Sequence, residues 1–121
     1  MRLLRPAMTS ATGIIVVVLI AGCSPVNGPE YHDPTNPVHL AQCLTTHDAR
    51  LYGADWCGYT RKQLGDFGDG ARYLDYVECT DDPEACKQAH IRGYPTWIIE
   101  GGTYPGYLQQ STLAKIIGCG Q

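Results

Sequence analysis

The chain has 121 residues, six cysteines and a formal net charge of −3. This length is enough for one domain. The charged side chains form no basic patch along the sequence, which excludes nucleic acids and acidic lipid surfaces as partners. A domain of this size buries only a modest core, so disulfides formed in an oxidising compartment would stabilise it.

Residues 1–22 have the organisation of an export signal. Two arginines precede a continuous apolar run that is shorter than the about 20 residues of a membrane span. The run ends in Ile20-Ala21-Gly22-Cys23, which resembles a bacterial lipobox and implies cleavage before Cys23 and lipidation of that cysteine. Ser24 resembles the Gram-negative sorting pattern that favours the outer membrane. The alternatives are an ordinary signal peptide and a buried apolar helix.

Residues 23–37 contain four prolines and no hydrophobic periodicity. They predict a semi-extended tether of about 3 Å per residue that would hold a domain near a membrane. We therefore expect a lipoprotein signal peptide over 1–22, a flexible tether over 23–37 and one folded domain over 38–121.

The folded domain alternates helical and strand patterns in the order helix, β-α-β-α-β-β-α. The predicted helices are 38–46, 59–67, 80 to about 90, and 111–118, and the predicted strands are 50–53, 73–79, 96–100 and 103–107. We expect Thr80 and Ser111 to cap the third and fourth helices. A glycine cluster after residue 64 is expected to end the second helix.

Cys57 lies where the first strand leads into the second helix, in the run Tyr52-Gly-Ala-Asp-Trp-Cys-Gly-Tyr-Thr60. The unpaired amides and the dipole at a helix start favour the thiolate, which is the reactive form. Thr60 stands where a dithiol motif would place its second cysteine. A threonine hydroxyl is too weak a nucleophile to resolve a mixed disulfide, but it can donate a hydrogen bond that lowers the pKa of Cys57. Monothiol exchange is therefore expected, and a relic thiol is the alternative.

Two segments, Ala54-Asp-Trp-Cys-Gly58 and Gly93-Tyr-Pro-Thr96, resemble the active-site and cis-proline segments of thioredoxin-like proteins. With Tyr76-Val-Glu-Cys79 and Ile91–Trp97, they resemble the thioredoxin-like domain fused to bacterial vitamin K epoxide reductase homologues. The resemblance covers about residues 39–119. It implies an α/β thioredoxin-like fold with a central mixed four-stranded sheet flanked by helices. The chain departs from the family at Thr60, and at Leu51, where many thioredoxins place a buried acid.

The resemblance also implies roles for residues around the thiol. Pro95 would be cis, with its loop facing Cys57 and offering backbone groups to an extended substrate; a tight turn of either isomer is the alternative. Trp56 and Tyr94 would line a hydrophobic groove for that substrate, while Trp97 either joins the groove or packs in the core. Cys79 and Cys86 would form a structural disulfide, the alternative being a second redox pair.

The remaining cysteines leave an odd number once Cys23 is lipidated, so at least one thiol is free or pairs between molecules. Cys57 is the candidate for that thiol. Cys43 and Cys119 lie in the first and last predicted helices, and a disulfide between them needs Cα atoms within about 7 Å. Otherwise one of them resolves Cys57, or both are free. The histidines show no zinc-ligand spacing with Cys57, so we expect no metal and no cofactor.

These patterns predict an exported, membrane-tethered protein that exchanges disulfides through Cys57, with a protein or small-thiol disulfide as substrate. A separate membrane redox partner is compatible with the resemblance. One alternative is an inactive thioredoxin-like binding module that captures a partner. Another follows from Cys57-Gly-Tyr-Thr60, which resembles the Cys-Gly-Phe-Ser motif of monothiol glutaredoxins. Those proteins use glutathione and iron–sulfur clusters in the cytosol, and export and the lack of an obvious glutathione-binding basic residue near Cys57 argue against this reading.

Overall fold

The computed structural model describes residue 13 and residues 36–120. The predicted signal peptide except residue 13, the lipidation at Cys23 and nearly all of the predicted tether lie outside the described residues. The elements in chain order are α1 (Pro37–Thr46), β1 (Arg50–Gly53), α2 (Gly58–Phe67), the 3₁₀ helix η1 (Gly68–Tyr73), β2 (Asp75–Glu78), α3 (Pro83–Gln88), β3 (Thr96–Ile99), β4 (Gly102–Pro105) and α4 (Gln110–Ile117). Within this part of the chain, no helix has the length and apolar character needed to cross a membrane.

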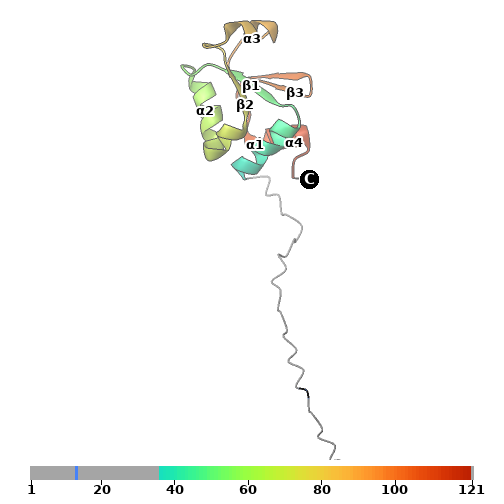
Figure 1. Cartoon of the computed structure of the whole chain (residues 1–121). Helices are drawn as coiled ribbons and strands as arrows, with labels where there is room; N and C mark the ends of the chain where they lie inside the picture. The colour runs from blue at the N-terminus through green and yellow to red at the C-terminus, as the bar shows by residue number, and fades with distance from the viewer. Residues whose placement is uncertain (1–12, 14–35, 121) are drawn as a thin grey trace, which may run out of the picture.

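Four strands form one mixed sheet in the order β2-β1-β3-β4. β1 and β2 are parallel, whereas β3 is antiparallel to both β1 and β4. The connection between the parallel strands β1 and β2 runs through α2. β2 forms one edge of the sheet, and β4 of the β3–β4 hairpin forms the other (Figure 1). The mixed four-stranded sheet with flanking helices that the sequence predicts is confirmed.

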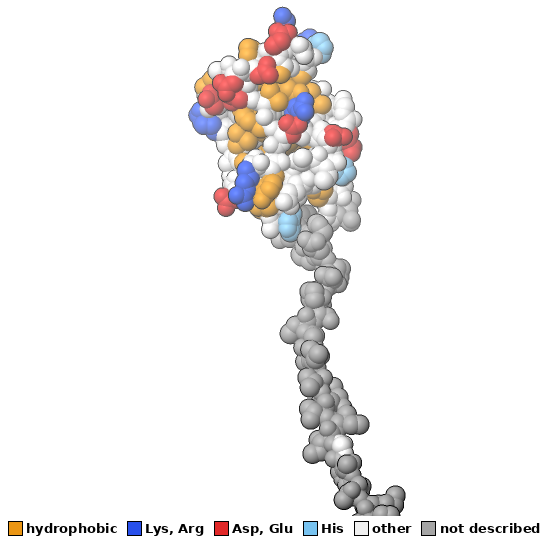
Figure 2. All heavy atoms as spheres, in the orientation of Figure 1, with side chains coloured by type: hydrophobic (Ala, Val, Ile, Leu, Met, Phe, Trp, Pro, Cys, Tyr) orange, Lys and Arg blue, Asp and Glu red, His pale blue; other side chains and the backbone are white. Residues whose placement is uncertain are grey.

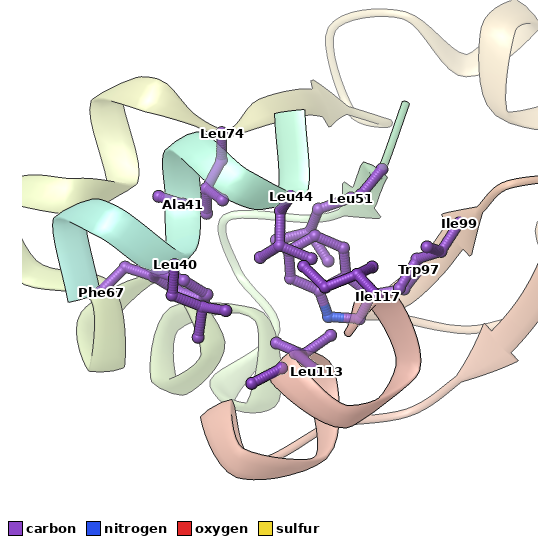
Figure 3. Packing of buried hydrophobic residues seen from close by; sticks show 12 residues of the cluster. Leu40, Ala41, Leu44, Leu51, Phe67, Leu74, Trp97, Ile99, Leu113 and Ile117 are labelled. Atoms are coloured by element: carbon purple, nitrogen blue, oxygen red, sulfur yellow. The ribbon is translucent and has the colours of Figure 1, made fainter. Parts of the chain in front are cut away.

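Side chains of the central strands alternate between two hydrophobic clusters, because successive residues of a strand point to opposite faces. Leu51 lies opposite Trp97 in the register, and both are fully buried in the larger cluster with side chains of α1, α2 and α4. Figure 3 shows Trp97 enclosed between residues of α1 and α4. Trp97 therefore belongs to the core. The smaller cluster on the other face contains Tyr52 and the cysteines at either end of the β2–α3 connection.

Helix caps differ from the sequence prediction at three places. α1 begins one residue early, at Pro37, because the Asn36 side chain accepts hydrogen bonds from the first-turn amides. α3 is capped by Asp82 and not by Thr80, since Asp82 directly precedes the proline of the first turn and its carboxylate accepts from the Ala85 N–H. α4 begins at Gln110, so Ser111 lies inside the helix and no side chain caps it.

The segment after α2 also differs from the prediction. Gly68, with φ +48°, ends the helix as expected, but residues 68–73 continue as a 3₁₀ helix, so β2 is shorter than predicted. A Cβ on Gly70 would lie 2.6 Å from the Pro37 carbonyl oxygen. This close approach places η1 against the start of α1.

On the face drawn in Figure 2, lysine and arginine side chains lie scattered among acidic ones.

Candidate functional site

Cys57 occupies the N-cap position of α2, directly after the loop that follows β1. It is the free cysteine among the described residues. The parallel β1 strand ends at Gly53, and Gly58 begins the helix. The fold thus presents a half-buried thiol at the positive end of a helix.

The thiol faces the loop before β3, 37 residues further along the chain. The Cys57 Sγ lies 3.6 Å from the carbonyl oxygen of Tyr94, and the Tyr94–Pro95 peptide bond is cis. Pro95 is itself buried, and its carbonyl accepts a hydrogen bond from the Gly106 N–H. The structure therefore brings together Cys57, Tyr94 and Pro95, with Tyr94 half-buried and Pro95 buried.

Trp56 forms the outer rim of the same site. Its side chain is 64% exposed and meets the Tyr94 ring edge-on, with 5.7 Å between ring centroids. Tyr59, on the first turn of α2, is 66% exposed. Exposed aromatic side chains beside a thiol can cover an apolar part of a bound molecule.

The surroundings of Cys57 lower the pKa of its thiol. The largest cause is the hydrogen bond from the backbone N–H of Thr60, which outweighs the opposing effect of burial. The Thr60 hydroxyl, the N–H of Tyr59 and the charge of Arg61 act in the same direction. Each of these groups favours the anion, so the thiolate forms at a lower pH than in an unstructured chain.

Thr60 is fully buried and belongs to both the helix and the loop. Its Oγ1 accepts a hydrogen bond from the Ala54 N–H at 3.3 Å. The hydroxyl hydrogen remains available for the Cys57 sulfur, because a hydroxyl donates and accepts at the same time. A Cβ on Gly53 would lie 2.5 Å from the Thr60 methyl carbon, so glycine is required where Thr60 packs against the end of β1.

The other described cysteines are paired. Cys43 is joined to Cys119, with 6.4 Å between Cα atoms, and Cys79 is joined to Cys86. These four residues hold no thiol that could attack Cys57 in this state. Leu51 is fully buried in the larger core cluster, so no acid occupies that position beneath the site.

Three side chains near the thiol were not predicted from the sequence: Glu78, Tyr76 and Arg61. Glu78 accepts a hydrogen bond from the Asp55 N–H at 3.2 Å, and Tyr76 donates to the same carboxylate. The period-2 pattern of β2 places Tyr76 and Glu78 on one face, which was the available signal. Arg61 is a basic residue near the thiol, and its guanidinium donates to the Asp55 carbonyl at 2.9 Å.

The sheet order, the cis-proline loop and the cysteine at the start of α2 define an α/β thioredoxin-like fold, as the resemblance implied. No family model matches the chain. The chain is similar to a thiol-disulfide oxidoreductase, LTO1, from Arabidopsis thaliana: the two are 37% identical over 90 residues, which cover 67% of this chain and 24% of the relative. The chain thus spans about a quarter of that relative's length. Fold and similarity together fit a thioredoxin-like family.

Proposed function

We propose that this protein exchanges disulfides through Cys57 by a monothiol mechanism. The observation that carries the proposal is a free thiol with a lowered pKa at the start of α2, facing a cis-proline loop, while four other cysteines are paired. The similarity to a protein named thiol-disulfide oxidoreductase supports the same chemistry.

The reaction begins when the Cys57 thiolate attacks one sulfur of a protein or small-molecule disulfide. A bond forms between Cys57 and that sulfur, the original disulfide bond breaks, and the second sulfur leaves with the electron pair and takes a proton from solvent. Thr60 stabilises the thiolate but cannot resolve the mixed disulfide. A second, external thiol must attack it, which releases Cys57 and forms a new disulfide.

Trp56, Tyr94 and Pro95 would position the substrate. The exposed Trp56 ring supplies apolar contact area, and the backbone beside Pro95 offers the carbonyl of Tyr94, now 3.6 Å from the sulfur. Because Pro95 is buried, it acts through the shape of the loop.

We further propose that the domain is exported and lipid-anchored through Cys23 to a bacterial membrane, with the outer membrane favoured by Ser24. The lipobox-like run and the resemblance to domains fused to vitamin K epoxide reductase homologues support this placement and a membrane oxidoreductase as partner. Metabolic labelling with an alkyne-tagged fatty acid tests it: a Cys23→Ala chain should lose the label and leave the membrane fraction.

The mechanism is tested with the full chain and a chromogenic aromatic disulfide. Mass spectrometry should find one mixed disulfide, on Cys57, and glutathione should then release it. Cys57→Ser should abolish the reaction while both disulfides persist. Adducts on any other cysteine, or no adduct at all, would contradict the proposal. A mixed disulfide that external thiols never release would favour the binding module instead.

The rate of Cys57 alkylation with iodoacetamide gives an independent check. The rate follows the thiolate fraction, which rises as the pH passes upward through the pKa. Because the pKa is lowered, the rate should level off at a lower pH than for a cysteine in an unstructured peptide. A profile matching that of the peptide would count against an activated thiol.

A further inference from the structure

The backbone N–H and carbonyl of Asp55, two residues before the thiol, are each held by a side chain. Its N–H donates to the Glu78 carboxylate at 3.2 Å, and its carbonyl accepts from the Arg61 guanidinium at 2.9 Å. The strand ladder of β1 has ended by this point, so these side chains replace it. The neighbouring bonds, from the Ala54 N–H to Thr60 and from the Cys57 N–H to the Ala54 carbonyl, complete the loop.

Glu78 is fixed by its own partners. It is the last residue of β2 and lies opposite Gly53 in the parallel register. The oxygen that accepts from Asp55 also accepts from the Thr80 N–H at 3.2 Å, and the other oxygen accepts from the Tyr76 hydroxyl. Burial alone would raise the pKa of Glu78, but these hydrogen bonds hold it below the ordinary value. The carboxylate is therefore ionised at neutral pH, and both of its oxygens accept hydrogen bonds.

We infer that Glu78 is a positioning residue for Cys57: by holding the Asp55 peptide, it fixes the loop that aligns the thiol with the first amides of α2. The inference rests on the proposed function, since it assigns a role within the reactive site. Glu78 is half-buried, and its charge cannot account for the lowered pKa of Cys57, because a negative charge near a thiol raises the pKa of that thiol. Arg61 donates to the Asp55 carbonyl, and its positive charge lowers the pKa of Cys57.

Glu78 could affect the pKa of Cys57 through its position or through its charge, and the two roles predict opposite effects for two conservative substitutions. Glu78→Asp keeps the charge but withdraws the oxygen from Asp55 by one methylene. Glu78→Gln removes the charge but keeps an oxygen for the Asp55 N–H and can donate its amide to the Tyr76 hydroxyl. If Glu78 acts by position, the aspartate variant loosens the loop and the glutamine variant does not.

The test is the pH profile of Cys57 alkylation by iodoacetamide in the full chain. We expect Glu78→Asp to raise the pKa of Cys57 by about half a unit, a threefold loss of thiolate below the pKa, and Glu78→Gln to leave the pKa unchanged or lower. Asp75→Asn, a carboxylate at the opposite end of β2 that pairs with Arg50, is the matched control and should not change the profile. Tyr76→Phe frees one oxygen of Glu78 and should give a smaller rise.

A larger rise in Glu78→Asp than in Glu78→Gln supports the inference, and any other pattern overturns it. Thermal unfolding of each variant is measured alongside, so that a rise in the pKa of Cys57 caused by a general loss of stability is recognised. Alkylation needs no disulfide substrate. Failure of the wild-type protein to exchange disulfides would therefore overturn the proposed function and leave the positioning role to be judged on the pKa values alone.

Discussion

Thr60 is the residue that most distinguishes this site from a dithiol one. It stands at the position of the second cysteine of a dithiol motif, and it also makes contacts that hold the site together. Its hydroxyl links the loop to the helix through Ala54, and its methyl group packs at the end of β1 where Gly53 leaves room. One buried side chain thus both lowers the pKa of Cys57 and holds the loop and helix around it.

Replacing Thr60 with valine should separate these contributions. The shape is kept, but the Ala54 N–H loses its acceptor, which costs about 1–3 kcal/mol for a buried group. We also expect the pKa of Cys57 to rise, because one hydrogen bond to the thiolate is lost. Urea unfolding and the alkylation profile measure the two effects. Thr60→Ser, which keeps the hydroxyl, is the control; if serine and valine behave alike, the hydroxyl has no such role.

At the scale of elements, α2 is anchored at both ends. Its start carries the thiol, and its later turns are tied to the segment before α4. Gln63, fully buried, donates to the Leu108 carbonyl at 3.0 Å and accepts from the Leu108 N–H at 2.8 Å. Asp66 accepts from the Tyr107 hydroxyl and from Lys62. The segment between β4 and α4 is thereby tied to the helix that carries the thiol.

Gln63→Leu should destabilise the domain strongly. The substitution leaves the N–H and carbonyl of Leu108 without partners, each costing about 1–3 kcal/mol when buried. Lys62→Gln, which removes a partly exposed ion pair one residue away, should change the free energy of unfolding far less, because water screens exposed ion pairs. Urea unfolding compares the two variants, and equal losses would show that the Gln63 pair is not a main anchor of α2.

At the scale of the whole molecule, the two disulfides have different reach. Cys43–Cys119 joins α1 to the residue two positions beyond α4, with a sequence separation of 76, and so closes nearly the entire domain. Cys79–Cys86 has a separation of 7 and closes only the connection from β2 into α3. A longer closed loop restricts the unfolded chain more.

Paired replacement of Cys43 and Cys119 by alanine should lower the free energy of unfolding by about 4 kcal/mol. The same replacement of Cys79 and Cys86 should cost about 2–3 kcal/mol from loop closure. Urea unfolding at neutral pH measures both, with the reduced wild-type protein for comparison. If removing Cys79–Cys86 lowers the free energy of unfolding more than removing Cys43–Cys119 does, packing of the buried sulfurs of the short loop outweighs the entropy of the unfolded chain.

Local patterns in the sequence determined the order of helices and strands, the glycine that ends α2 and the placement of Cys57 at a helix start. These features depend on neighbouring residues, and so hydrophobic period and cap chemistry predict them. The 3₁₀ helix η1 was not predicted, and the caps of α3 and α4 were wrong, because several polar residues near each helix start can serve as a cap.

Only the tertiary structure decided which distant groups meet. It paired Cys43 with Cys119, placed Tyr94 against the thiol across 37 residues, buried Trp97 in the core and brought Glu78 to the Asp55 peptide. These contacts depend on how the strands align in the sheet, which no local pattern specifies. The sequence by itself determined that a cysteine stands at a helix start without a second motif cysteine. The fold decided what surrounds it, because the sheet register sets the distances between segments that are far apart in the chain.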